Sequence, residues 1–325
     1  MIPLTVATGR YDRTAALREG RIRPEGLDLT WLTLNVEQIF WRMMRHREFD
    51  ASEMSFSGYT IRRSRGQDDF VAIPVFLSRS FRHSAVYVNP RSGIKRPEDL
   101  AGGRIGMPEY QMTAAVWARG MLEDDYGVAV DEVRWVQGGL EQPGRRPFEP
   151  VEPEGISLEF APEGRTLGTM LADGELDALI SPRVPSVYES GAVTRLFENP
   201  WEAERDYYDR TGIFPIMHTV AIKREIVDAN PWIAQTLSNA FLAAKREADA
   251  ALADTTVLTV GLPFLVQHVR ETAALMGEDF WPYGVEPNRT TIEAFLRYAE
   301  RQGLLASPIE IDDLFPASTR ATSKV

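Results

Sequence analysis

The chain has 325 residues and a formal net charge of −11, with 44% hydrophobic and 26% charged residues. This length exceeds what one compact core usually holds, so the sequence predicts two lobes or domains. The negative charge argues against nucleic acid as a partner. The absence of cysteine excludes disulfides, thiolate metal sites and cysteine nucleophiles.

The N-terminal residues run directly into an apolar, strand-like segment at 2–8. No basic region followed by a long apolar stretch precedes it, and no window approaches the roughly 18 apolar residues of a membrane span. We therefore expect a cytoplasmic protein that has no membrane partner. A chain from which an export signal has been removed is the alternative.

Short apolar segments alternate with helical patterns in the first part of the chain, which is typical of an α/β fold with largely parallel sheets. The spacing of apolar residues at 36, 39, 40, 43 and 44 predicts an amphipathic helix. Strands are expected at 2–8, 26–34, 51–55, 70–77 and 84–88, and helices at 12–19 and 36–45.

The middle of the chain repeats this alternation before the pattern becomes helical. Strands are expected at 104–107, 132–136 and 178–181, and helices at 113–125 and 166–173. The segment 138–154 is rich in glycine, proline and charge, which predicts a long loop that could act as a lid. A strand at 219–222 and helices at 231–252, 257–276 and 290–302 follow.

This order predicts a two-lobed α/β fold whose lobes are joined by two crossovers. Lobe 1 is expected to contain residues 1–85 and 219–325, and lobe 2 residues 86–218. A ligand would then bind in the cleft between the lobes, because open α/β sheets bind ligands beyond the carboxyl ends of their strands.

Five arginines lie at predicted strand ends, and they form the first group of candidate site residues. A guanidinium group presents a planar fork that matches a carboxylate and stays charged at any relevant pH. Each arginine alone is more simply read as a surface or ion-paired residue, but we expect at least two of the five to face an anionic ligand. They are Arg10, Arg13, Arg79, Arg82 and Arg183.

Two histidines, His83 and His218, lie at the two predicted crossovers and should meet in space. Imidazole titrates near neutral pH, so they are the best general acid and base in the chain. A buried structural histidine is nearly as good an explanation for each. Glu53, at a predicted strand end among small and apolar residues, is the carboxylate that would orient or relay protons.

The loop after the strand at 104–107 supplies further candidates, Glu109 and Tyr110. Glu109 precedes a predicted helix, where an acid also has a capping role. Tyr11, Tyr110 and two phenylalanines, Phe81 and Phe214, could stack against an aromatic ring, although core packing is their commoner fate. Glu53 and Glu109 together with the two histidines could hold a divalent metal, but no short ligand spacing supports this, so no cofactor is expected.

Read in order, these segments resemble the 4,5-dihydroxyphthalate decarboxylase family, and the resemblance covers nearly the whole chain. The runs that carry it are 7–14 (ATGRYDRT), 40–43 (FWRM), 49–55 (FDASEMS), 71–76 (VAIPVF), 81–84 (FRHS), 108–115 (PEYQMTAA), 135–141 (WVQGGLE), 212–219 (GIFPIMHT) and 281–284 (WPYG). The resemblance implies a fold like that of type II periplasmic binding proteins.

The resemblance also implies an enzyme that removes one carboxylate from a hydroxylated aromatic acid. One such acid is 4,5-dihydroxyphthalate, which would give 3,4-dihydroxybenzoate. Our hypothesis for the mechanism is protonation of the ring, with histidines as acid and base and arginines as carboxylate ligands. Two alternatives remain open: a non-catalytic solute-binding protein for a small aromatic acid, and a metal-dependent decarboxylase. The sequence leaves the substrate, the oligomeric state and the order of the two histidines undecided.

Overall fold

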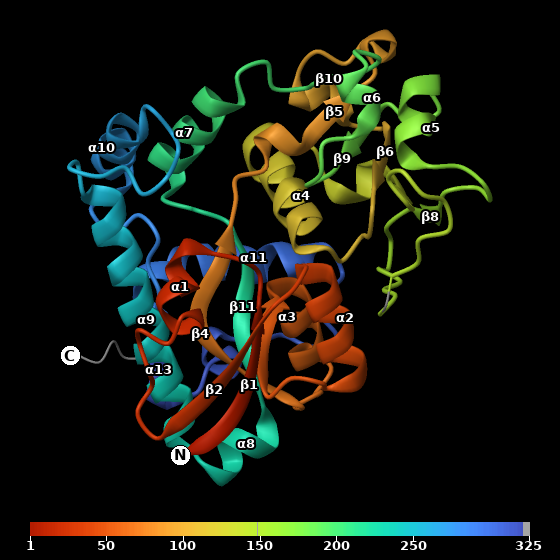
Figure 1. Cartoon of the computed structure of the whole chain (residues 1–325). Coiled ribbons are helices and arrows are strands. Elements are labelled where there is room, and N and C mark those ends of the chain that lie inside the picture. Colours follow the sequence, from red (N-terminus) through yellow and green to blue (C-terminus); the bar gives the residue numbers. More distant parts are fainter. Residues whose placement is uncertain (148, 321–325) are drawn as a thin grey trace. The chain divides into compact units, whose positions relative to one another are not determined.

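The computed structural model of the chain describes residues 1–147 and 149–320 (Figure 1). It divides into two compact units. Unit 1 comprises residues 1–79, 216–292 and 309 onward, and unit 2 comprises residues 80–215 and 293–308. The chain therefore passes between the units four times, whereas the sequence analysis expected two crossovers.

Unit 1 is built on a five-stranded sheet with the strand order β2-β1-β3-β11-β4. Strand β1 is parallel to β2 and β3, and β11 is antiparallel to both β3 and β4. The carboxyl ends of β1 to β4 therefore lie at the same edge as the amino end of β11, and we call this the site edge. The strands are β1 (Ile2–Thr8), β2 (Leu27–Thr33), β3 (Ala51–Ser55), β4 (Phe70–Arg79) and β11 (Ile216–Lys223).

Helices cover both faces of this sheet, with α1 and α9 on one side and α2 and α3 on the other (Figure 1). Helix α9 buries Ile233, Leu237, Phe241 and Ala244, which recur at helical spacing and pack against apolar side chains of β1, β4 and β11. The helices are α1 (Ala15–Arg18), α2 (Val36–His46), α3 (Phe56–Ser64), α8 (Arg224–Ala229), α9 (Trp232–Ala253), α10 (Leu265–Met276), α12 (Ile311–Leu314) and α13 (Ala317–Arg320).

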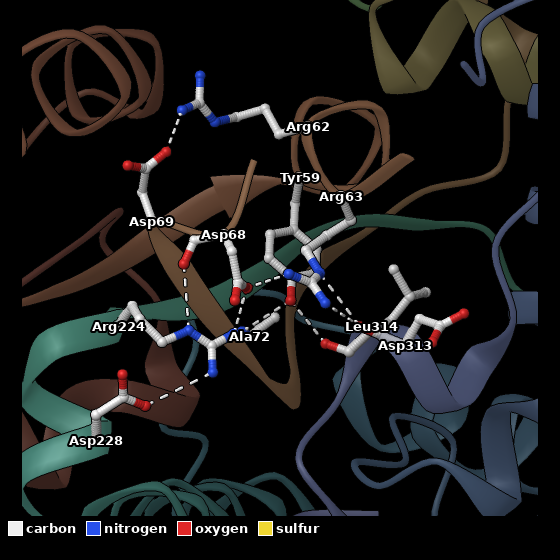
Figure 2. A network of polar contacts seen from close by, with 10 residues as sticks. All are labelled: Tyr59, Arg62, Arg63, Asp68, Asp69, Ala72, Arg224, Asp228, Asp313 and Leu314. Atoms are coloured by element: carbon white, nitrogen blue, oxygen red, sulfur yellow. Dashed lines mark hydrogen bonds and ion pairs between the residues drawn. The ribbon is translucent and has the colours of Figure 1, made fainter. Parts of the chain in front are cut away.

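A polar network fastens the C-terminal segment to unit 1 (Figure 2). The hydroxyl of Tyr59 on α3 accepts a hydrogen bond from Ala72 N (3.2 Å) on the edge strand β4 and donates one to Leu314 O (2.7 Å). Arg63 donates to the carbonyl of Asp313 and pairs with Asp68. These contacts hold α12 beside α3, and Tyr59 provides an acceptor for a buried backbone amide on the edge strand of the sheet.

Unit 2 is built on a six-stranded sheet with the order β10-β5-β9-β6-β7-β8. Its core includes Val136, Leu167, Leu171 and Leu179. The strands are β5 (Val86–Val88), β6 (Arg104–Met107), β7 (Arg134–Gln137), β8 (Leu158–Phe160), β9 (Ala178–Ile180) and β10 (Thr194–Arg195), and the helices α4 (Thr113–Tyr126), α5 (Leu167–Asp173), α6 (Ser186–Glu189) and α7 (Pro200–Thr211).

The unit boundaries differ from the predicted lobes 1–85 with 219–325 and 86–218. Residues 293–308, which include most of helix α11 (Arg289–Arg301), belong to unit 2. Tyr298 packs edge-on against Trp117 of α4, and a Cβ on Gly120 would collide with the Tyr298 ring. Gln302 accepts from the buried Arg119 at 2.7 and 2.9 Å. Helical periodicity predicts α11 but does not say which unit its apolar face covers.

Several elements were placed differently from the sequence prediction or were not predicted. The helix expected at 257–276 begins only at Leu265. Helices α3 and α7 were not expected, although Asn199 caps α7 by accepting from Glu202 N (3.4 Å) and Pro200 occupies its first turn. Among the described residues, no helix is long and apolar enough to cross a bilayer.

Candidate active site

Glu53 lies on β3, the central strand of the unit 1 sheet, and its side chain is completely buried. A buried carboxylate is costly unless hydrogen bonds replace the water it has lost. The site edge provides such donors, because β1 runs parallel to β3 and its carboxyl end delivers the loop that begins at Gly9 beside Glu53. Glu53 is therefore the natural starting point for a site in this unit.

Three donors from two segments, the loop after β1 and strand β11, converge on this carboxylate. The backbone N–H of Gly9 donates to Oε2 (2.8 Å), the hydroxyl of Tyr11 to Oε1 (2.6 Å), and Nδ1 of His218 also to Oε1 (2.6 Å). His218 reaches Glu53 because its cross-strand neighbour is Ser55, which lies two residues after Glu53 on the same face of the sheet.

The ionisation of Glu53 decides the direction of these bonds. Burial alone would raise the pKa of the carboxyl, but the bonds from His218, Tyr11 and Gly9 outweigh it and hold the pKa below its usual value. Glu53 is thus a carboxylate that only accepts, so Nδ1 of His218 is the donor. This fixes the orientation of the imidazole, on a side chain that is still 17% exposed.

Tyr11 stays a neutral phenol in this arrangement. Its pKa is raised well above the usual value, first by burial and then by the negative charge of Glu53. The side chain of Ser78 also hydrogen-bonds Tyr11. Tyr11 therefore acts as a hydrogen-bond donor to Glu53 rather than as an anion.

Sequence reasoning missed most of these partners. It treated Tyr11 only as an aromatic wall and named neither Gly9, Ser78 nor Phe40 as part of the site. Phe40 on α2 packs edge-on against the His218 ring, with centroids 4.8 Å apart. Glu53 itself was the signal that could have found them. A carboxylate in a buried central strand needs hydrogen-bond donors, and the ends of the neighbouring strands supply them.

The three candidate arginines of unit 1 have different environments. Arg79 is 6% exposed and donates to the carbonyl of Pro282 (2.9 Å) and to Asn288. Arg13 donates to the carbonyl of Leu77 (3.1 Å from Nε) and pairs with Asp12. Arg10, between the two loop residues that contact Glu53, is exposed, and it has no hydrogen-bond or ion-pair partner among residues 1–147 and 149–320.

His83 belongs to unit 2, in the short 3₁₀ turn His83–Ala85, where it is 1% exposed. Phe197 and Tyr207 pack edge-on against its ring at 5.1 and 5.3 Å. Neither ring nitrogen has a hydrogen-bond partner in the part of the chain that the structure describes. Burial, and then the positive charge of Arg210, lower the pKa of His83 to about 4.

The remaining predicted site residues also belong to unit 2. Burial lowers the pKa of Arg82 to about 10, with Glu204 as the opposing charge. Both Nε and Nη2 of Arg145, from the 138–154 loop, donate to Glu109, at 2.8 and 2.7 Å. Tyr110 is completely buried and donates to the carbonyl of Gln302 (3.0 Å). Arg183 is exposed, and its backbone N–H donates to Ser181 Oγ (3.2 Å).

The structure thus brings Glu53 and His218 into direct contact, with Arg10 on the adjoining loop. Since His83 and His218 belong to different units, their meeting stays a prediction. Within the described residues, no group of three or more histidine or acidic side chains is placed to hold a metal ion.

Solved structures that are similar to this chain confirm the predicted fold. The periplasmic sulfonate-binding protein SsuA of Methylobacillus flagellatus KT has a TM-score of 0.57 at 14% identity, covering 97% of this chain and 92% of that one. The periplasmic aliphatic sulphonate binding protein SsuA of Escherichia coli has a TM-score of 0.51 at 15% identity, covering 97% of each. At these identities the likeness shows only a periplasmic-binding-protein-like α/β fold.

Curated sequences are much more similar, although no family model matches the chain. The chain is 42% identical over 323 residues to the 4,5-dihydroxyphthalate decarboxylase of Comamonas testosteroni, covering 98% of this chain and 97% of that protein. It is 42% identical over 208 residues to the protein of the same name from Pseudomonas putida, covering 63% of this chain and 81% of that protein. The two-lobed α/β fold is the one predicted, and the sequence and length match those of the curated relatives. The chain therefore belongs to the 4,5-dihydroxyphthalate decarboxylase family of carboxy-lyases.

Proposed function

We propose that this protein converts 4,5-dihydroxyphthalate into 3,4-dihydroxybenzoate and carbon dioxide, with His218 as the residue that protonates the ring. Membership of the family supports the substrate. The observation that carries the mechanism is the buried Glu53 carboxylate bound to Nδ1 of His218. That contact fixes the orientation of the imidazole, and its Nε2 has no hydrogen-bond partner among the described residues.

The substrate supplies the electrons for its own decarboxylation. Each carboxylate of 4,5-dihydroxyphthalate is para to a hydroxyl group, and electron donation from that oxygen raises the electron density at the carbon that bears the carboxylate. A proton added at this carbon gives a protonated, dienone-like intermediate, in which the para oxygen keeps its hydrogen and shares the positive charge. Breaking the bond to the carboxylate returns its electron pair to the ring and releases carbon dioxide. The dianion thus takes up one proton and leaves as the 3,4-dihydroxybenzoate monoanion.

In this proposal, His218 delivers the proton from Nε2. The hydrogen bond from Nδ1 to the Glu53 carboxylate keeps the ring from rotating. General acid catalysis of this kind typically contributes roughly 10²- to 10⁴-fold. Positioning of the substrate adds to this factor.

Arg10 is our candidate for binding the carboxylate that the product retains. It is exposed on the loop that joins Gly9 to Tyr11, and both neighbours contact Glu53. Its guanidinium offers the planar fork that a carboxylate fits. Arg13 and Arg79 are engaged with carbonyl groups of unit 1, so they fit this role less well.

The proposal needs no metal or redox cofactor, because the para hydroxyl group supplies the electron density and His218 the proton. Activity that is unchanged after dialysis against a chelator is the expected result. Loss of activity on chelation, restored by one divalent metal, would instead favour the metal-dependent alternative.

The test is a reaction of the purified protein with carboxyl-labelled 4,5-dihydroxyphthalate. We expect labelled carbon dioxide and 3,4-dihydroxybenzoate, and in deuterium oxide one deuterium at the vacated ring carbon. His218→Ala should lose this activity, whereas the matched variant His268→Ala, at an exposed position of α10, should keep it. Binding of the substrate with no release of label would show a solute-binding protein instead.

A further inference from the structure

The end of strand β4 leaves the regular sheet next to the site. Val220 of β11 pairs with Ile73 and His218 with Ser78, so residues 74–77 of β4 stand opposite Thr219 alone. Such an irregularity re-aims the strand and frees carbonyl groups from the ladder. Pro74 lies within it and has no backbone N–H to contribute to the ladder.

Donors from a loop of unit 1 and from the 3₁₀ turn Asp12–Thr14 occupy these carbonyl groups. Gly284 N donates to Pro74 O (2.8 Å), and Nε1 of Trp281 donates to Phe76 O (2.8 Å). Nε and Nη2 of Arg13 both donate to Leu77 O. The irregular end of β4 therefore fixes Trp281 and Arg13 side by side.

Arg13 lies against two aromatic rings. Its guanidinium carbon is 4.1 Å from the ring centroid of Trp281 and 4.4 Å from that of Tyr11. A guanidinium is attracted to aromatic faces at such distances, and more strongly where water is excluded. Arg13 has a side chain that is only 15% exposed, so the three groups form a largely buried stack.

We propose that Trp281 and Arg13 are positioning residues that hold Tyr11 against Glu53 and thereby keep His218 oriented. This inference rests on the proposed function, because it assigns these two residues a task in the same proton transfer. Tyr11 is the link, since its ring contacts Arg13 and its hydroxyl donates to Glu53 Oε1, the same oxygen that accepts from His218. Arg13 thus has a role other than binding the substrate carboxylate.

The experiment compares Trp281→Leu, which removes the aromatic face, with Trp281→Phe, which keeps a face but loses the bond to Phe76 O. The control is Trp201→Leu, at an exposed tryptophan of α7. Arg13→Lys is a second variant that keeps the charge but loses the planar group, in case Trp281→Leu does not fold. For each folded variant, kcat and KM are measured with 4,5-dihydroxyphthalate.

A spectroscopic readout makes the test independent of activity. The chain has four histidines, so nitrogen-15 labelling of histidine gives a spectrum in which the Nδ1–H of His218 can be assigned by its loss in His218→Ala. We expect Trp281→Leu and Arg13→Lys to shift or broaden this signal and to lower kcat about tenfold, with KM changed less than about twofold. Trp281→Phe should restore most of kcat and the signal, and the control should match the wild type.

Two results would overturn the positioning role. One is a folded Trp281→Leu variant with wild-type kcat and an unchanged His218 signal. The other is a Trp281→Phe variant as impaired as Trp281→Leu, because the stack would then contribute nothing beyond the bond to Phe76 O. If the wild-type protein does not decarboxylate the substrate, the proposed function fails, while the His218 signal still tests the positioning.

Discussion

His83 and His218 have opposite surroundings. Each lies a few residues after a point where the chain passes from one unit to the other. His218 of unit 1 is partly exposed and donates from Nδ1 to a buried carboxylate. His83 of unit 2 is buried against Phe197 and Tyr207, and neither of its ring nitrogens has a partner among the described residues. The sequence made them equal candidates for acid and base.

In the proposed mechanism, a hydrogen-bond partner rather than a position near a strand end equips a histidine for proton transfer. A carboxylate that accepts from one ring nitrogen fixes the orientation of the ring. Burial of His83 among aromatic rings, and then the positive charge of Arg210, disfavour the charged form and lower the pKa of His83 to about 4. We therefore expect the two residues to respond differently to every change that tests acid–base chemistry.

The largest effect should follow removal of the His218 imidazole or of its partner's charge. His218→Ala and Glu53→Gln should each lower kcat by about 10²- to 10⁴-fold, because they remove the proton donor or the carboxylate that orients it. His83→Leu, which keeps most of the side-chain volume, should change kcat by less than about threefold. Steady-state kinetics with folded variants checks this, and an equal loss in His83→Leu would break the comparison.

A smaller effect concerns the pH dependence of stability. His83 has a folded pKa of about 4, below its ordinary value of 6.5, so the unfolded chain takes up the proton first as the pH falls. The contribution of neutral His83 to the free energy of unfolding is complete above about pH 6.5. It is lost as the pH falls towards 4, by up to roughly 3 kcal/mol. Urea unfolding between pH 7.5 and 4.5 measures it.

His83→Leu is the matched variant for this measurement, since it cannot take up a proton. Its free energy of unfolding should change less over the same pH range than that of the wild type. His268→Leu, at an exposed position, should leave the wild-type dependence as it is. Parallel pH curves for the wild type and His83→Leu would contradict the buried, neutral state of His83.

Arginines give the next contrast. Arg10 is exposed without a described partner, whereas Arg82 is half-buried near Glu204. Arg10→Lys should raise KM about tenfold with little change in kcat, because a charged hydrogen bond is lost with the planar fork. Arg82→Lys should leave KM unchanged and lower only stability. Equal KM values for Arg10→Lys and the wild type would place the carboxylate-binding residue elsewhere.

Much of the fold could be predicted from the sequence because strands and amphipathic helices have clear periodicities. The strands expected at 2–8, 51–55 and 104–107 match β1, β3 and β6. The position of 293–308 could not be predicted, because periodicity shows that a helix has an apolar face but not which surface it covers. Residue pairs such as Tyr298 with Gly120, which settle this, are far apart in the sequence.

The site was less predictable for a related reason. Glu53 and His218 could be chosen one by one from residue type and strand ends, but their contact depends on the antiparallel register of β11 with β3. The stack of Trp281, Arg13 and Tyr11 depends on the irregular end of β4, which no local sequence pattern predicts. Single residues can be read from a sequence, whereas their hydrogen-bond partners follow from strand pairing.

The smallest effect should come from the aromatic neighbours of the two histidines, whose geometry is nearly the same. Phe40 meets His218 at 4.8 Å and 82°, and Phe197 meets His83 at 5.1 Å and 78°. Such an edge contact contributes about 0.5–1.5 kcal/mol beyond burial. Phe40→Leu should therefore lower kcat about threefold through looser orientation of His218, whereas Phe197→Leu should leave kcat unchanged and lower only the urea midpoint. If both variants lower kcat equally, the two aromatic contacts affect activity to the same extent. The hydrogen bond to Glu53 is then not what distinguishes the two histidines.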